Sequence, residues 1–234
     1  MGRILQQKPI EVVLLDYDGV IADSLITIHS FYEYVCKKHG KKFDMNFDEF
    51  REWFPYDWRN GYGSLGFSDK EISTLVIPEF MKFMNSEIIP VYNGVETVLR
   101  KIHNNCNGPK LGIVSTNHTG QIKNNLRSHG LLRFFDTVVG YEDVSEIKPS
   151  PEGMLTALSS LGVKDCNVLI VGDSTEDYAA ATRAKEVYNG GILFLFAAYG
   201  HYTRQKFVNG VIKNGLEVPP VQITSINGVL PWVI

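Results

Sequence analysis

The stretch EVVLLDYDGVIADS, residues 11–24, decides the fold of this chain. Four consecutive apolar residues, 12–15, lead directly to Asp16, and a second aspartate follows two positions later at Asp18. An apolar run without alternation is typical of a strand that is covered on both faces of a parallel sheet. Because alternate residues of an extended chain point the same way, both carboxylates are expected to face one cleft at the strand's end. Gly19 then frees the backbone to turn away.

Four further apolar runs have the same character, at residues 111–115, 137–140, 167–172 and 191–197. Helical patterns lie between them, including one with apolar residues at i, i+3, i+4 and i+7 from residue 95. Ser150 is the expected N-cap of another helix, and Ser174 of a third. This alternation predicts an α/β fold with a doubly wound, Rossmann-like parallel sheet. The apolar tail after residue 215 is expected to add one short edge strand.

A long segment separates the first strand from the second, and its patterns are helical over residues 23–40, 47–54 and 69–85. We therefore expect a small α-helical cap domain over residues 22–90. The α/β core is then formed by residues 1–21 and 91–234.

Composition narrows the classes of partner and compartment. The chain has 234 residues, 44% of them hydrophobic, with a formal net charge of −3. It has no basic excess, so neither a nucleic acid nor an anionic membrane is an expected partner. The three scattered cysteines fit a reducing compartment. The N-terminal residues show neither a signal-peptide pattern nor a myristoylation site, and no apolar run has membrane-spanning length, so we expect a cytoplasmic protein.

Polar residues gather where the predicted strands end, and ligands of open α/β sheets bind at this edge. These residues are Asp16, Asp18, Ser115, Thr116, Asp173, Ser174, Glu176 and Asp177, with Lys148 in a nearby loop. Two carboxylates about 4 Å apart repel by about 4 kcal/mol at an effective dielectric of about 20, so the cluster needs cations. Lys148 supplies one charge, and a divalent metal would supply more.

The donor atoms and the surrounding motifs indicate which metal is expected. These motifs contain no His or Cys, which favours a hard cation, Mg²⁺, and Mg²⁺ sites with few carboxylates usually include substrate phosphate. Each motif alone also fits a turn or a helix start, but their joint position at strand ends favours a phosphate site.

Four segments of the chain resemble the motifs of the haloacid dehalogenase superfamily of phosphohydrolases. They are DYDGV at 16–20, GIVSTN at 112–117, IKPSPE at 147–152 and VGDSTED at 171–177. In addition, VYNGVETVLRKI at 91–102 resembles the segment that re-enters the core after a helical cap of the phosphoglycolate phosphatase-like kind. The resemblance covers most of the chain, and the four motifs are specific together although each is weak alone.

The resemblance implies a Mg²⁺-dependent phosphatase that hydrolyses a small phosphorylated metabolite through an aspartyl-phosphate intermediate. It makes Asp16 the nucleophile and Asp18 the general acid and base. Ser115 would hydrogen-bond the phosphoryl group, and Lys148 would neutralise it. The implied metal ligands are Asp16, the main-chain carbonyl of Asp18, and Asp173, with Asp177 just behind them. Implied phosphate contacts come from the backbone around Tyr17, Gly19, Thr116 and Asn117.

Two departures and several cap residues complete the predictions. Val20 stands where many relatives carry Thr, and the unusual segment 185–191 is expected to lengthen the loop before the last core strand. Within the aromatic-rich segment 43–67, Arg51, Arg59 and Tyr62 are candidate substrate contacts, although its aromatics fit the cap's own core better. His201 is expected to be a loop residue rather than a catalyst.

Other functions stay open at this point. A phosphomutase of the β-phosphoglucomutase type would keep both aspartates, and a non-catalytic phosphometabolite-binding module would keep the fold. A dehalogenase has no need for Asp18 or Asp173, and a phosphonate hydrolase would need a cap lysine that we do not find. The sequence does not indicate the substrate or the oligomeric state.

Overall fold

A six-stranded parallel sheet forms the centre of the protein in the computed structural model, which describes residues 9–55 and 58–234. Its order is β3-β2-β1-β4-β5-β6, with every neighbouring pair parallel. The strands are β1 Val12–Leu15, β2 Lys110–Val114, β3 Thr137–Val139, β4 Val168–Gly172, β5 Ile192–Ala197 and β6 Gln222–Ile223. The five predicted strands and the short edge strand are all present, so the doubly wound fold is confirmed.

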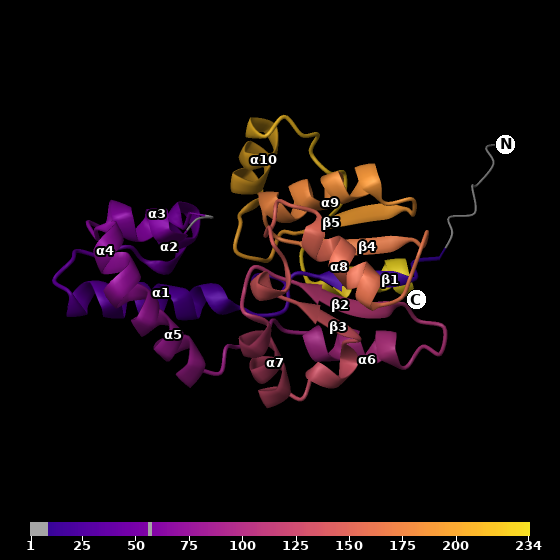
Figure 1. Cartoon of the computed structure of the whole chain (residues 1–234), viewed down its shortest axis with the longest axis horizontal. Coiled ribbons are helices and arrows are strands. Elements are labelled where there is room, and N and C mark those ends of the chain that lie inside the picture. The colour runs from indigo at the N-terminus through magenta and orange to yellow at the C-terminus, as the bar shows by residue number, and fades with distance from the viewer. Residues whose placement is uncertain (1–8, 56–57) are drawn as a thin grey trace.

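Helices cover both faces of this sheet (Figure 1). One face packs against α6 Val95–His103, α7 Thr119–Ser128 and the C-terminal turns Ile226–Val229 and α11 Leu230–Val233. The other face packs against α8 Glu152–Ser160, α9 Thr175–Val187 and α10 Arg204–Lys213. Within β1, Val13 and Leu15 enter the first layer, whereas Val12 and Leu14 enter the second. The apolar run of β1 lacks alternation because both faces of this strand are buried.

Helix starts agree with the sequence with one correction. Ser174 caps α9 as predicted, and its hydroxyl and the Asp177 carboxylate form a reciprocal capping box. In contrast, α8 begins at Glu152 with Pro151 as its N-cap, one residue after the predicted Ser150. The backbone N–H of Ser150 is held in a turn by a 2.9 Å bond to Ile147 O, so the helix starts later.

Segment 185–191 does not lie wholly in a loop, because α9 continues as far as Val187. Only the residues between Val187 and Ile192 connect the helix to β5. The expected longer loop is therefore partly extra helix.

The segment after β1 forms a separate helical lobe, seen on the left of Figure 1. It contains α1 Ser24–Lys38, α2 Phe47–Trp53, α3 Trp58–Ser64, α4 Asp69–Glu71, a π-helical turn Ile72–Val76 and α5 Ile77–Ser86. We call the segment from α1 to α5, with its connections, the cap. The sequence did not predict α3, which contains two glycines that weaken the helical signal.

The cap has its own hydrophobic cluster, which includes the buried residues Phe31, Tyr32, Phe50 and Tyr62. The rings of Tyr32 and Tyr62 stack at 4.1 Å with an interplanar angle of 7°. Aromatic pairs of this kind add about 0.5–1.5 kcal/mol beyond the area they bury. Tyr62 is therefore part of the cap's core.

No helix in residues 9–55 or 58–234 is long and apolar enough to cross a membrane. The predictions on a signal peptide and myristoylation fall mainly on residues 1–8, which lie outside the described part of the chain.

Candidate active site

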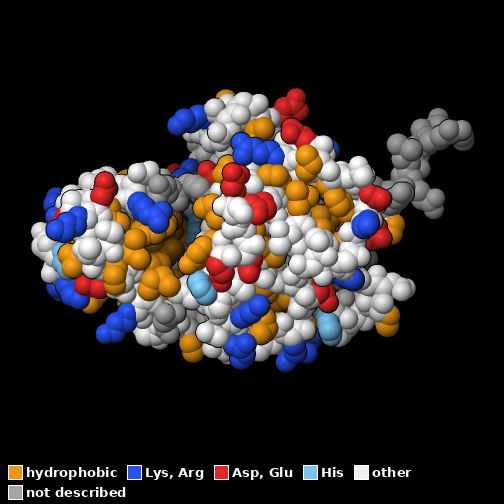
Figure 2. Space-filling model, viewed as in Figure 1, with side chains coloured by type: hydrophobic (Ala, Val, Ile, Leu, Met, Phe, Trp, Pro, Cys, Tyr) orange, Lys and Arg blue, Asp and Glu red, His pale blue; other side chains and the backbone are white. Residues whose placement is uncertain are grey.

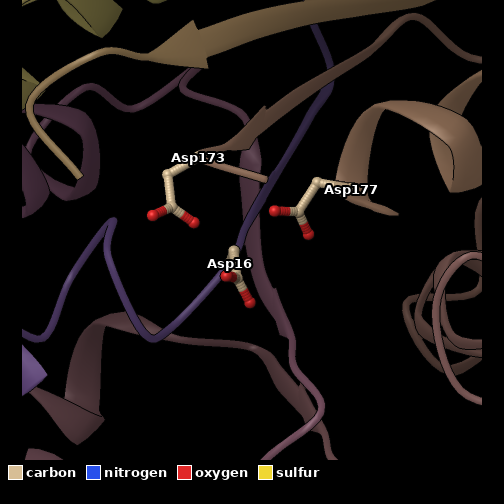
Figure 3. Close-up of side chains that lie close together, drawn as sticks. All are labelled: Asp16, Asp173 and Asp177. Carbon is tan, nitrogen blue, oxygen red and sulfur yellow. The ribbon is translucent and has the colours of Figure 1, made fainter. Parts of the chain in front are cut away.

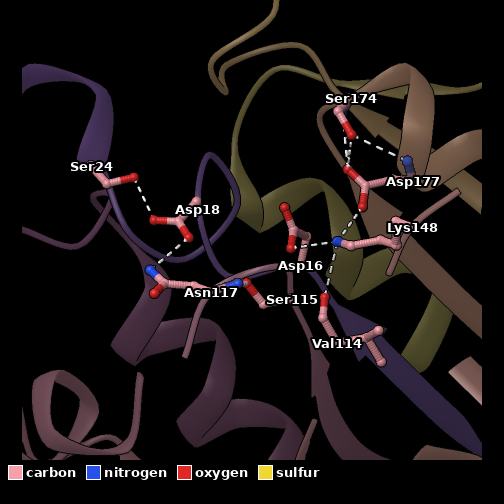
Figure 4. A network of polar contacts seen from close by, with 9 residues as sticks. All are labelled: Asp16, Asp18, Ser24, Val114, Ser115, Asn117, Lys148, Ser174 and Asp177. Carbon is pink, nitrogen blue, oxygen red and sulfur yellow. Dashed lines mark hydrogen bonds and ion pairs between the residues drawn. The ribbon is translucent and has the colours of Figure 1, made fainter. Parts of the chain in front are cut away.

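Lys148 lies between two carboxylates at the carboxyl edge of the sheet (Figure 4). Its Nζ is 2.7 Å from Asp16 Oδ1 and 2.5 Å from Asp177 Oδ1, and it also donates to Val114 O at 3.1 Å. The Lys148 side chain is only 6% exposed. Burial lowers the pKa of Lys148, but the two carboxylates raise it more, so its net shift is upward. The lysine therefore stays protonated beside Asp16.

Three carboxylates converge at this edge from different elements (Figure 3). Asp16 follows β1, Asp173 follows β4 and Asp177 lies in the first turn of α9. One carboxylate oxygen from each lies within 4.8 Å of those of the other two. Burial and the Asp177 charge raise the pKa of Asp16 to about 8 despite Lys148. Burial, with the charges of Asp16 and Asp177, also raises the pKa of Asp173 well above its usual range.

The raised pKa values of Asp16 and Asp173 indicate that one lysine does not balance the negative charge of this cluster. Its ligand atoms are all carboxylate oxygens, which hard divalent cations such as Mg²⁺ prefer. The residues present therefore fit the metal that the sequence predicted.

Asp18 sits in a different environment from Asp16. Ser24 Oγ donates to its Oδ1 at 2.6 Å, and Asn117 Nδ2 donates to its Oδ2 at 3.1 Å. Burial raises the pKa of Asp18, and the two hydrogen bonds oppose this shift only in part. Neutral donors thus hold a carboxyl group that can carry a proton, whereas Asp16 is in contact with a cation.

The strand-end loops place the remaining predicted residues around these carboxylates, but not all their N–H groups face the cleft. Thr116 and Asn117 line it, whereas the Asn117 N–H donates to Ser115 Oγ at 3.1 Å. The Gly19 N–H donates to Ala22 O at 2.9 Å. Tyr17 points into the core, where its hydroxyl accepts from Asn125 Nδ2 at 2.7 Å. The sequence predicts that the backbone N–H groups of Gly19 and Asn117 bind phosphate. In the structure both donate to other groups of the protein instead.

Two glycines allow the chain to approach Asp173 closely. Gly19 has φ +82°, and a Cβ at this position would overlap the Asp173 carboxylate. A Cβ on Gly200 would overlap the same side chain. The next residue, His201, donates its backbone N–H to Asp173 Oδ2 at 2.5 Å. The loops after β1 and β5 therefore fix the orientation of this carboxylate.

A cavity of about 200 Å³ opens above these residues, between the core and the cap. The space-filling view shows a hollow there, with hydrophobic side chains gathered on the cap's side (Figure 2). The cavity is lined by Asp16, Asp18, Ile28, Phe54, Trp58, Phe80, Met84, Thr116, Asn117, Lys148, Asp173, Ser174, His201 and Tyr202. Its position between a polar floor and an apolar roof makes it the candidate substrate site.

The two predicted cap arginines lie elsewhere. Arg59 is exposed, and its guanidinium lies over the Trp58 ring at 4.7 Å from the centroid. It is not among the described residues that line the cavity. Arg51 instead joins the cap to the core, because it donates to His201 O at 3.2 Å and to Gly200 O at 2.6 Å. Neither arginine is therefore among the described residues that line the cavity.

Sequence reasoning missed two features of this site. His201 does lie in a loop, as predicted, but it also lines the cavity, with Nε2 3.2 Å from Ser24 Oγ. The apolar cap lining was also missed. Its signal was the aromatic content of residues 43–67, which contributes Phe54 and Trp58.

Comparison with known proteins agrees with this geometry. The family model of the haloacid dehalogenase-like hydrolases matches residues 13–187. The chain belongs to this family. It is therefore a hydrolase, which confirms the enzyme class that the four motifs predicted.

Two curated relatives are pyrophosphatases named PpaX. The protein from Halalkalibacterium halodurans is 27% identical over 183 residues, which cover 75% of this chain and 80% of that protein. The protein from Listeria monocytogenes serotype 4a is 35% identical over 106 residues, which cover 45% of this chain and 48% of the relative.

Solved structures share the fold over almost the whole chain. A haloacid dehalogenase-like family hydrolase from Streptococcus pneumoniae has a TM-score of 0.76 at 19% identity, covering 95% of this chain and 98% of that one. A predicted phosphoglycolate phosphatase from Haemophilus somnus has a TM-score of 0.74 at 17% identity, covering 95% and 97%. At these identities the likeness concerns the fold alone.

Proposed function

We propose that this hydrolase is a Mg²⁺-dependent phosphatase that cleaves a small phosphate monoester through an aspartyl phosphate on Asp16. The observation that carries the proposal is the contrast between two carboxylates two positions apart. Asp16 is 2.7 Å from the Lys148 ammonium, whereas Asp18 is held by the neutral donors Ser24 and Asn117. Two carboxyl groups in such different environments suit two roles, a nucleophile and a general acid.

In the first step, a carboxylate oxygen of Asp16 attacks phosphorus, and the bond from phosphorus to the leaving oxygen breaks. Asp18 transfers its proton to that oxygen, so the alcohol leaves neutral. In the second step, Asp18 takes a proton from water as the water oxygen attacks phosphorus. This frees Asp16 and releases inorganic phosphate, and Asp18 is again protonated. General acid–base help of this kind contributes about 10²–10⁴-fold.

Most of the acceleration must come from positioning and charge, since the hydrolysis of phosphate monoesters can need up to ~10²¹-fold catalysis. Lys148 is buried and points at Asp16, where it would neutralise the transferring phosphoryl group. The residues that would hold Mg²⁺ are Asp16, Asp173 and the main-chain carbonyl of Asp18. Bound Mg²⁺ supplies further neutralisation of phosphoryl charge. Asp177 is bonded to Ser174 and Lys148, which suits a supporting role behind these ligands.

Release of inorganic phosphate from a panel of monoesters, with Mg²⁺ and after chelation, tests this function. We expect turnover that needs Mg²⁺ and that Asp16→Asn abolishes. Asp44→Asn is a matched control, because Asp44 is an exposed cap carboxylate paired with Lys42. Near-normal turnover by the Asp16 variant would refute the proposal. A complete lack of turnover with any metal would favour a binding module, and a requirement for a sugar bisphosphate would favour a phosphomutase.

A further inference from the structure

The cavity above Asp16 has two chemically different halves. The core supplies its charged and polar floor, which includes Asp16, Lys148 and Asp173. Every cap residue that lines it in the described part of the chain is apolar: Ile28, Phe54, Trp58, Phe80 and Met84. A phosphoryl group on the floor would therefore place its leaving group against the apolar half.

A smaller recess of about 60 Å³ lies within the cap, next to the apolar half. This recess is lined by Ile28, Tyr32, Phe54, Trp58, Tyr62 and Phe80, four of which also line the main cavity. The rings of Trp58 and Phe80 lie 6.2 Å apart with an interplanar angle of 20°. The shared residues place the recess directly beside the substrate cavity.

The cations near the cavity are bound to other groups. Lys148 contacts the carboxylates of Asp16 and Asp177, and Arg51 donates to the carbonyls of Gly200 and His201.

Two further basic side chains near the cavity, Lys206 and His201, also contact other groups of the protein. Lys206 Nζ donates to the carbonyls of Arg51 and Phe54. The ring of His201 has its Nε2 3.2 Å from Ser24 Oγ. Among the described residues, no Lys or Arg of the cap lines the cavity, and Arg59 lies over the Trp58 ring outside that lining.

We propose that the leaving group of the substrate is uncharged and apolar, such as an aromatic or aliphatic alcohol, and is bound by Trp58, Phe80 and their neighbours. This inference rests on the proposed phosphatase function and adds the class of substrate. It disfavours substrates whose leaving group is a second phosphate or carries a carboxylate. Moving an ionised group from water into an apolar site without a partner is costly, whereas burying an aromatic ring is favourable.

A matched pair of substrates tests the charge of the leaving group. Benzyl phosphate and its 4-carboxy derivative are primary benzylic esters that differ in one remote carboxylate. We expect kcat/KM for benzyl phosphate to exceed that for the carboxy derivative by at least about tenfold. Pyrophosphate, measured in parallel, is expected to be a poorer substrate than benzyl phosphate.

Cap variants test whether the named rings make the difference. Trp58→Ala should lower kcat/KM for benzyl phosphate by about tenfold or more, and it should affect methyl phosphate much less. Phe83→Ala is the control, because Phe83 is on the same helix as Phe80 and packs on Phe31 outside both cavities. Phe80→Arg should bring a cation to the roof and raise kcat/KM for the carboxy derivative by about tenfold.

The outcomes separate the two proposals. Equal turnover of the matched pair, or a preference for the carboxy derivative or pyrophosphate, overturns the apolar leaving group and leaves the phosphatase function intact. A lack of turnover of every ester overturns the phosphatase function, and this inference with it. A preference for benzyl phosphate that Trp58→Ala removes and Phe83→Ala keeps supports both proposals. The comparison of substrates on the unaltered protein stands even if a variant fails to fold.

Discussion

Replacing Lys148 with methionine removes the only lysine that contacts the acidic cluster in the described residues, and it should destabilise the protein strongly. The three side chains involved are nearly dry, with exposures of 6% for Lys148, 11% for Asp16 and 2% for Asp177. Removal of one partner from a buried ion pair typically costs about 3–5 kcal/mol, because the other charge is left uncompensated. We expect a loss of this size in the free energy of unfolding of Lys148→Met.

The assay is urea unfolding at mildly alkaline pH in the presence of a chelator. At this pH the carboxylates left without Lys148 are least able to lose their charge by taking up protons. Lys42→Met is the matched control, because Lys42 pairs with Asp44 at 2.8 Å but their side chains are 85% and 70% exposed. Exposed ion pairs of this kind contribute little, so the control's midpoint should not move measurably. A Lys148→Met protein as stable as the control would refute the view that Lys148 balances buried charge.

Three further predictions follow from individual contacts. Gly19→Ala should lower kcat by at least about 100-fold in a phosphate-release assay, because its Cβ would displace Asp173 and its φ of +82° strains any side chain; near-normal turnover would contradict this. Asn125→Ala should lower the free energy of unfolding in urea by about 2–4 kcal/mol, because it strands the buried Tyr17 hydroxyl and a backbone N–H; an unchanged midpoint would refute it. Burial lowers the pKa of Lys206 from 10.5 to about 8, so the unfolded chain binds more protons between these values. Relative to Lys206→Met, the protein should therefore gain stability as pH rises through this interval, and parallel pH profiles would argue against the shift.

The sequence predicted those parts of the site that depend on strand ends. Asp16, Asp18 and Asp173 directly follow or closely succeed apolar runs, and parallel strands bring their carboxyl ends to one edge. Lys148 was assigned through its motif, and the structure places it 2.7 Å from Asp16. The three aspartates could be predicted because their positions follow from the order of strands and helices alone.

The contacts that hold Asp18 could not be predicted in the same way. Ser24 begins the cap and Asn117 follows β2, so their contacts with Asp18 depend on how the first cap helix meets the core. His201 follows β5, and its position beside Ser24 requires the sheet order and the bend at Gly200. Local patterns contain none of this information.

Helix phase explains why Trp58 lines the cavity and Arg59 does not. Successive helical residues are rotated by about 100°, so Trp58 and Arg59 cannot face the same way. Trp58 lines the cavity, and the exposed Arg59 instead lies over the Trp58 ring. Because α3 itself was not predicted, its phase was also unknown. The apolar roof of the cavity therefore became visible only in the structure.

The central claim is that Asp16 becomes phosphorylated during turnover. The most direct measurement uses Asp18→Asn, in which the second step should be slow, with Mg²⁺ and 4-nitrophenyl phosphate, whose leaving group departs without a proton from Asp18. Acid quench, borohydride reduction and peptide mass spectrometry then identify the phosphorylated residue, because an aspartyl phosphate is reduced to homoserine. We predict homoserine at position 16, and none in the Asp16→Asn, Asp18→Asn double variant. Phosphate release by the protein without any modification at Asp16, or modification of another residue in its place, would contradict the account.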